Sequence, residues 1–235
     1  MLLENIVNAK IIDLTHELAE NIPIWPGIVP FQHKMLEDYS YEGYRTFSFT
    51  QSEGVGTHMD SPKHFQPGGR GIADLKITDL IAPVCVIDVR EQVKLNPNYR
   101  ISVQDLENWE AKHGGITKRS IVLGFTGWSQ YWDDVQKYLN QDANGTMHFP
   151  GWGKEAATLL VARGIVGIGI DTISIDAGEE HTFASHHVLL GNNVYIIENL
   201  TNLAKLPSSG ALVIALPLKI KDGVESPIRA IALVS

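Results

Sequence analysis

The sequence predicts an α/β protein built on a mixed, partly antiparallel sheet. Short apolar runs typical of buried strands alternate with amphipathic segments typical of helices along the 235 residues. Near both ends of the chain, consecutive strand segments have no helix between them, which favours antiparallel pairing there. The chain contains no internal repeat, low-complexity tract or Pro/Ser-rich linker. We therefore expect a single domain over residues 1–235.

The individual elements follow from apolar patterning and from helix start and stop signals. Strands are expected at residues 11–14, 45–51, 84–89, 120–125, 165–170, 194–197, 212–216 and 229–234. Residues 45–51 alternate in polarity, which predicts a strand with one buried face. One helix is expected from the cap Ser102 to about Lys112, and a second between Pro150 and Gly164.

Composition and charge exclude several classes of function. The 27 acidic and 19 basic residues give a net charge of −8, and no basic run exceeds the dipeptide Lys118-Arg119, so nucleic acid is not an expected partner. No apolar run approaches the ~20 residues of a membrane span. The first residues lack the features of a secretory leader. The single cysteine, Cys85, cannot form an internal disulfide, and we expect a cytoplasmic protein.

Residues with catalytic chemistry are concentrated between His58 and His64. His58 and Asp60 are two positions apart, so an extended backbone places both side chains on one face. An imidazole beside a carboxylate suits a divalent ion such as zinc or manganese. Pro62 is well placed to begin a helical turn with Ser61 as its N-cap. That turn brings His64 close to the metal, where a general base is needed.

A second segment carries His186, His187 and Glu198. Glu198 ends an apolar strand, where a carboxylate is anomalous unless it is paired or bound to metal. A salt bridge at the strand end is the alternative interpretation. The turn at residues 191–193 allows either histidine to fold back beside that strand. Together the two segments predict a hydrolytic metal site with an open position for water, because a structural site would be closed.

The motif GTHMDSPKH at residues 56–64 resembles the signature His-x-Gly-Thr-His-x-Asp-x-Pro-x-His of the cyclase family of metal-dependent hydrolases. That family includes bacterial kynurenine formamidase and isatin hydrolase. Further similarity lies at residues 25–27, 169–176, 186–190, 198–200 and 217–220, so the resemblance spans nearly the whole chain. It implies a swivelling β/β/α domain that associates as a homodimer or homotetramer.

Position by position, the resemblance also implies site residues. His58 and Asp60 match metal ligands of the family, and His64 matches its catalytic base. His186 and Glu198 match residues that help the formamidase hold a second zinc. The sequence does not decide which of the two adjacent histidines faces the metal, so His187 is the alternative to His186.

One position departs from the family signature. Its first histidine falls on Gly54, which favours one ion, as in the manganese site of isatin hydrolase, over a two-zinc site. The expected cofactor is one divalent ion, manganese or zinc, with a second ion as the alternative. Trp25 lies in a region that lines the substrate pocket in this family. An aromatic wall there suits a flat substrate, although a core anchor is the other interpretation.

The predicted function is a metal-dependent hydrolase that cleaves a formamide or opens a cyclic amide in a small-molecule substrate. Metal-activated water would be the nucleophile and His64 the general base. A lactone hydrolase of the same family and a non-catalytic metal- or ligand-binding protein on this scaffold are the alternatives. Asp171, Ser174 and Asp176 could form a proton relay or shape a turn.

Overall fold

A closed, mixed sheet forms the centre of the protein in the computed structural model, which describes residues 9–234. Its strands are β1 (Lys10–Asp13), β4 (His58–Asp60), β5 (Ile81–Asp88), β7 (Ile121–Phe125), β9 (Gly167–Ile170), β10 (Tyr195–Glu198), β11 (Ala211–Pro217) and β12 (Glu225–Val234). They follow the order β1-β12-β11-β5-β7-β9-β10-β4. Because β12 also pairs with β4, the sheet closes on itself.

Strand direction changes along the sheet. The run β5-β7-β9-β10 is parallel, whereas β1, β12, β11 and β5 pair antiparallel, as β4 does with both β10 and β12. The longer helices are α3 (Arg90–Leu95), α4 (Val103–His113), α6 (Lys154–Arg163) and α7 (Ala184–Gly191). The predicted mixed α/β fold is therefore confirmed. Its finer description as a swivelling β/β/α domain stays a prediction.

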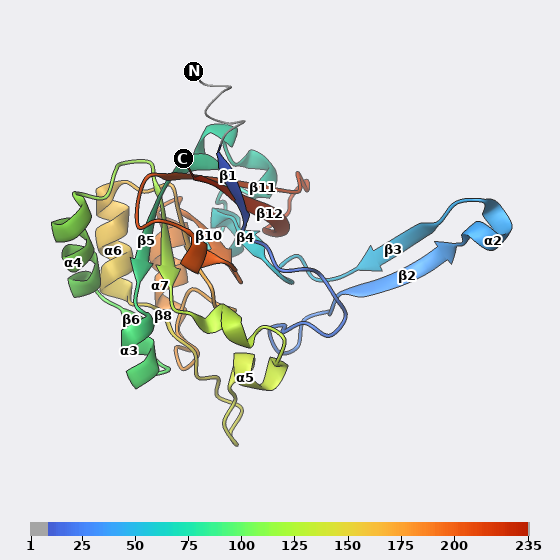
Figure 1. The fold of residues 1–235 in the computed structure, drawn as a ribbon, viewed down its shortest axis with the longest axis horizontal. Coiled ribbons are helices and arrows are strands. Elements are labelled where there is room, and N and C mark those ends of the chain that lie inside the picture. The colour runs from blue at the N-terminus through green and yellow to red at the C-terminus, as the bar shows by residue number, and fades with distance from the viewer. Residues whose placement is uncertain (1–8, 235) are drawn as a thin grey trace.

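Two apolar cores lie on opposite sides of the central strands. In β5, Cys85 and Ile87 belong to the core that α4 and α6 also fill, while Val84 and Val86 belong to the other. This division follows from the alternation of side chains along a strand. Figure 1 shows α4 and α6 together beside the parallel strands. Met59 of β4 is fully buried in the second core, which anchors the strand that carries the candidate ligands.

Both predicted helices are present. The hydroxyl of Ser102 accepts a hydrogen bond from the backbone N–H of Asp105 and begins α4, and α6 ends at Gly164, whose φ is 75°. The remaining short elements are α2 (Tyr39–Glu42), α5 (Val135–Leu139), β6 (Arg100–Ile101), β8 (Gly151–Trp152) and the 3₁₀ turns Pro62–His64, Ile72–Asp74, Ile77–Asp79, Trp128–Tyr131 and Leu203–Lys205.

A long hairpin extends away from the rest of the molecule (Figure 1). It consists of β2 (Gln32–Glu37) and β3 (Thr46–Thr50), with α2 at its tip. The strand expected at residues 45–51 is present, but its expected buried face was wrong. Phe47 and Phe49 are 44% and 60% exposed. The alternating pattern predicts which side chains share a face, but the hairpin projects beyond the cores that could cover that face.

The cytoplasmic location expected from the sequence stays a prediction. Within residues 9–234, no helix has the length and apolar character needed to cross a bilayer. The initial residues, on which the expectation of no secretory leader depends, lie outside the described range.

His16 should make the stability of the protein depend on pH. Its ring stacks on Trp132 at 3.9 Å between centroids, and its Nε2 is buried without a hydrogen-bond partner. Burial lowers the pKa of His16 to about 4, although the charge of Asp133 opposes this. Between pH 6.5 and 4 the unfolded chain therefore binds a proton that the folded chain does not, so stability falls as the pH falls.

The variant His16→Phe keeps the stacked ring and removes this titration. We expect its free energy of unfolding, relative to wild type, to increase as the pH falls from about 6.5 to about 4, by at most about 3 kcal/mol. Urea unfolding of both proteins across this range measures the difference. A difference that does not change with pH would contradict the assignment.

Candidate active site

The pairing of β4 with its two neighbours assembles a cluster of ionisable side chains. His58 lies opposite Glu198 of β10, and Asp60 lies opposite Glu225 of β12. Directly opposite residues, and residues two apart on one strand, project from the same face of a sheet. His58, Asp60 and Glu198 are only 3%, 1% and 4% exposed. The interpretation that His58 and Asp60 share a face agrees with this geometry.

His186 reaches the same cluster from α7. Its Nε2 lies 3.5 Å from Oδ2 of Asp60 and 3.4 Å from Oε1 of Glu198. His187 is exposed, because neighbouring residues on a helix point about 100° apart. The sequence predicted no helix here, since the residue before α7 is Phe183, whose side chain makes no capping hydrogen bond.

A hydrogen bond at Nδ1 fixes the orientation of each imidazole in the cluster. Nδ1 of His58 lies 2.9 Å from the carbonyl oxygen of Gly56, and Nδ1 of His186 lies 2.6 Å from Oδ2 of Asp176. Facing an oxygen acceptor, Nδ1 donates its proton, which leaves the lone pair on Nε2. A histidine held in this way by a carbonyl or carboxylate is typical of metal sites. Both Nε2 atoms point into the cluster.

The donor atoms fit a divalent metal ion. Nε2 of His58 lies 3.3 Å from Oδ1 of Asp60 and 3.3 Å from Oε2 of Glu198. The ligand atoms of these three residues all lie within 4.8 Å of one another. Oδ1 of Asp60 is buried and has no hydrogen-bond partner. Such an atom is costly to bury unless a cation binds it, and mixed imidazole and carboxylate donors suit zinc or manganese.

The charges in the cluster strongly shift the pKa values of its side chains. Burial alone would lower the pKa of His58, but the nearby carboxylates of Asp60 and Glu198 raise it well above its usual value. Burial would also lower the pKa of His186. The carboxylates around it, Asp176 first among them, instead raise that pKa well above its usual value. For Asp60, burial raises the pKa, yet the two nearby imidazoles of His58 and His186 hold it below its usual value. The carboxylates thus attract positive charge, which a divalent cation supplies by displacing the protons.

His64 lies beside this cluster and outside its buried part. β4 ends at Asp60, and the 3₁₀ turn begins at Pro62, so the predicted change from strand to turn is confirmed. Ser61 occupies the N-cap position, but its hydroxyl donates to the carbonyl of Val224 instead of capping the turn. The side chain of His64 is 29% exposed, and its Nδ1 lies 3.8 Å from Oε2 of Glu225. A general base needs such access to water and substrate.

The cluster opens into a pocket of about 370 Å³. Trp25, Phe65 and Phe183 line it, with ring centroids 6.0 Å apart for Trp25 and Phe183 and 5.6 Å apart for Phe65 and Phe183. Trp25 lines this pocket and also packs against the first apolar core, so its role in substrate binding stays a prediction. Phe65 and Phe183 were not predicted as pocket residues, because each belongs to a segment singled out only for its histidine.

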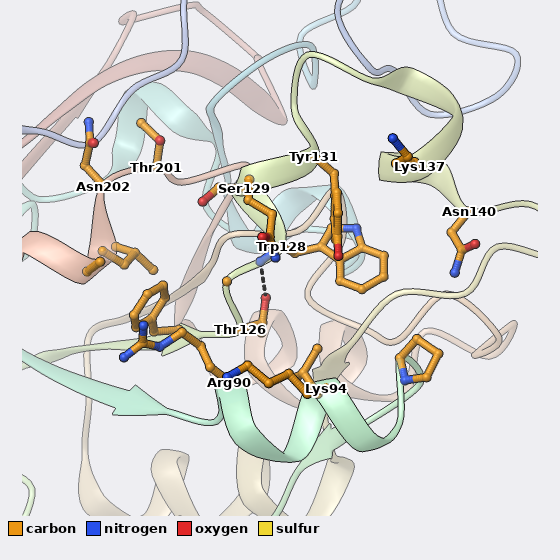
Figure 2. A pocket seen from close by; sticks show the side chains of 17 residues that line it. Arg90, Lys94, Thr126, Trp128, Ser129, Tyr131, Lys137, Asn140, Thr201 and Asn202 are labelled. Atoms are coloured by element: carbon orange, nitrogen blue, oxygen red, sulfur yellow. Dashed lines mark hydrogen bonds between the residues drawn. The ribbon is translucent and has the colours of Figure 1, made fainter.

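A larger cavity of about 910 Å³ lies beside α3 and α5 (Figure 2). Among the described residues that line it there is no His, Cys, Asp or Glu. Its three cations already have acidic partners: Arg90 pairs with Asp88 at 2.8 Å, Lys94 with Glu91 at 2.6 Å and Lys137 with Asp134 at 2.8 Å. The smaller pocket is therefore the better candidate for catalysis.

Asp176 acts on the cluster through His186. Its carboxylate accepts hydrogen bonds from the backbone N–H groups of Ser185, at 2.7 Å, and of His186, at 3.1 Å, in addition to the imidazole. Asp171 instead accepts hydrogen bonds from Thr126 and from the N–H of Gly127, and burial raises its pKa to about 6. Their contacts therefore differ, and the geometry favours a positioning role for Asp176.

We expect Asp176→Asn to weaken metal binding by about 10–100-fold, because His186 would lose the acceptor that fixes its orientation. Calorimetric titration of the chelator-treated variant with Zn²⁺ measures the change. Glu179→Gln is the matched control, since Glu179 is an exposed carboxylate nearby in the chain that pairs with Arg100. Equal affinities for the two variants would contradict the positioning role.

Glu225 is an ionisable residue of the site that the sequence did not reveal. It follows the turn at residues 221–222 and begins the last strand, with no motif around it. Only the pairing of β12 with β4 brings its carboxylate to the cluster.

Similarity to known proteins extends over almost the whole chain. The family model described as "Putative cyclase" matches residues 12–177. The isatin hydrolase of Roseibium aggregatum is 35% identical over 237 aligned residues, which cover 97% of this chain and 88% of the relative. The kynurenine formamidase of Bacillus anthracis is 29% identical, with 95% of this chain and 97% of the relative covered.

Solved structures agree with these sequence matches. Isatin hydrolase A from Ralstonia solanacearum superposes with a TM-score of 0.93 at 33% identity and covers 100% of this chain and 96% of its own. An isatin hydrolase bound to the product analogue thioisatinate superposes with a TM-score of 0.92 at 33% identity, covering 99% and 94%. The family predicted from residues 56–64 is thus confirmed. The chain belongs to the cyclase family of metal-dependent hydrolases.

Proposed function

We propose that this protein is a metal-dependent hydrolase of amide C–N bonds that opens a cyclic amide or cleaves a formamide. The buried cluster of His58, Asp60 and Glu198, with an oriented imidazole and an unpartnered carboxylate oxygen, carries this proposal. Similarity to an isatin hydrolase, at 35% identity, supports the cyclic amide as the first substrate class to test.

His58, Asp60 and Glu198 would hold one divalent ion, manganese or zinc, which supplies Lewis-acid polarisation of a carbonyl and lowers the pKa of water toward ~7. His186 contributes a further donor between Asp60 and Glu198, so a second ion is the alternative. We favour one ion, because the ligand atoms of His58, Asp60 and Glu198 all lie within 4.8 Å of one another.

The protein's own residues orient the substrate and move the proton. His64 accepts a proton from the attacking water as the water oxygen bonds to the carbonyl carbon. It returns that proton to the nitrogen as the C–N bond breaks, so the products are a carboxylic acid and an amine. Trp25, Phe65 and Phe183 provide aromatic faces against which a flat ring system packs and from which water is excluded.

Chelator-treated protein tests this proposal. We expect hydrolysis of isatin, or failing that of N-formylkynurenine, to disappear on chelation and to return with about one equivalent of Mn²⁺ or Zn²⁺ per chain. Turnover of simple lactones, without turnover of isatin or N-formylkynurenine, would indicate that the protein hydrolyses an ester bond instead of an amide bond. Stoichiometric metal binding without turnover of any of these compounds would contradict catalysis and favour a binding protein.

We also propose that the protein forms a homodimer or homotetramer through the hairpin of β2 and β3. Met35, Leu36, Phe47 and Phe49 are 47%, 58%, 44% and 60% exposed on it. Apolar side chains on a projecting hairpin are typical of an interface with another chain. Light scattering should give two or four times the chain mass, and a monomer at micromolar concentration would contradict this.

A further inference from the structure

Gly54 and Glu225 share one space at the edge of the cluster. A Cβ built on Gly54 would clash with Oε1 of Glu225. The Glu225 carboxylate therefore occupies the place that any side chain at position 54 would need. The family signature has a histidine at that position, whereas in this chain a carboxylate from a distant strand fills the space.

The Glu225 carboxylate faces the candidate ligands. Its residue lies opposite Asp60 in the pairing of β12 with β4. Oε1 lies 3.7 Å from Nε2 of His58, and Oε2 lies 3.8 Å from Nδ1 of His64. Its side chain is 21% exposed, so it lies on the pocket side of the buried cluster. Glu225 thus stands between a candidate ligand and the proposed base.

The charges around Glu225 call for a cation. Two carboxylates directly opposite each other on paired strands repel, and Asp60 faces Glu225 in this way. No Lys or Arg is among the described residues that line the pocket. Oδ1 of Asp60, on a residue only 1% exposed, has no hydrogen-bond partner. These are independent signs that a bound cation, and not a Lys or Arg side chain, balances the carboxylates.

The backbone around Glu225 is held in place by the residue before Gly54. Oε2 of Glu53 accepts hydrogen bonds from the N–H of Val224, at 2.9 Å, and from the N–H of Glu225, at 3.0 Å. The two segments are therefore tied together where the carboxylate enters the space above Gly54. These hydrogen bonds fix the backbone at Glu225, so the fold itself sets the position from which its carboxylate reaches the cluster.

We infer that Glu225 is a metal ligand that acts with His58 and Asp60, in place of the histidine that the family signature has at position 54. Carboxylate oxygens and an imidazole nitrogen are suitable donors for Mn²⁺ or Zn²⁺. The inference rests on the proposed metal-dependent function and adds a residue to its site.

Calorimetric titration with Mn²⁺, and separately with Zn²⁺, tests this inference on the chelator-treated full chain. Glu225→Gln keeps the shape of the side chain and removes its charge, and we expect the Kd to rise by at least about 10-fold and up to about 100-fold. Asp222→Asn is the matched control, because Asp222 is a carboxylate in the same segment whose side chain is 77% exposed. Its Kd should equal that of wild type.

The outcomes separate this inference from the proposed function. Equal Kd values for Glu225→Gln and wild type would overturn the inference and leave the metal-dependent function intact. A wild-type chain that binds neither ion would overturn both. The visible spectrum of the Co²⁺-loaded protein gives a second measurement. It should change in Glu225→Gln and not in Asp222→Asn, and an unchanged spectrum in Glu225→Gln would also overturn the inference.

An exchange of donors tests whether the two positions are equivalent. Glu225→Ala empties the space above Gly54, and adding Gly54→His should return a donor to it. We expect the double variant to bind Zn²⁺ about 10-fold or more tightly than Glu225→Ala alone. Binding as weak as that of the single variant would overturn the shared location.

Discussion

Replacing Asp60 with alanine is expected to abolish metal binding and hydrolysis together. Asp60 lies between two imidazoles, with Oδ1 3.3 Å from Nε2 of His58 and Oδ2 3.5 Å from Nε2 of His186. Glu198 contacts the same two imidazoles from β10, so Asp60 is one of two carboxylates that join them. We expect the affinity for Zn²⁺ to fall by about 100-fold or more, and turnover to fall with metal content. Elemental analysis and an isatin assay on one preparation measure both.

Asp60→Asn distinguishes loss of a ligand from loss of the fold. The amide has the same size as the carboxylate but lacks its charge, so the buried packing of β4 is retained. Its circular dichroism spectrum should match that of wild type while metal content falls. An Asp60→Asn protein that retained one ion per chain and full turnover would contradict the assignment of Asp60.

Replacing His64 with alanine is expected to separate metal binding from catalysis. His64 lies outside the buried donors, with 29% of its side chain exposed. Loss of a general base typically costs about 10²–10⁴ in rate. We therefore expect turnover to fall by about that factor while metal content stays at the wild-type level. Steady-state kinetics and elemental analysis of the same sample provide the measurement.

His187→Ala is the matched control for His64→Ala. His187 is an exposed histidine whose ring lies 5.1 Å from that of Phe65, at the edge of the same region. Its removal should leave turnover close to that of wild type. Full activity in His64→Ala would contradict its role as the base, and equal losses in both variants would point to a general disturbance of the pocket.

Local sequence signals predicted the strand and turn that carry three of the proposed site residues. Pro62 cannot continue an extended ladder and favours the start of a helical turn. Consequently the spacing from His58 to Asp60 and then to His64 was sufficient to place two side chains on one face and the third beside them. The apolar run before Glu198 likewise predicted β10 and a buried carboxylate at its end.

Features that depend on distant pairing could not be predicted in the same way. Glu225 belongs to the site only because β12 pairs with β4, and no local pattern predicts that register. The choice between His186 and His187 needed a helix whose N-terminus carries no capping side chain. The alternation in β3 was correctly interpreted as a strand, but the burial of Phe47 and Phe49 depends on what the hairpin packs against.

The central claim is that one divalent ion binds where β4 meets β10 and β12. Anomalous diffraction at the manganese or zinc edge, from crystals of the metal-loaded protein, tests it most directly. We predict one strong peak per chain, about 2.0–2.3 Å from Nε2 of His58 and from a carboxylate oxygen of Asp60. A metal-loaded crystal with its peak at other residues, and none at this cluster, would contradict the account.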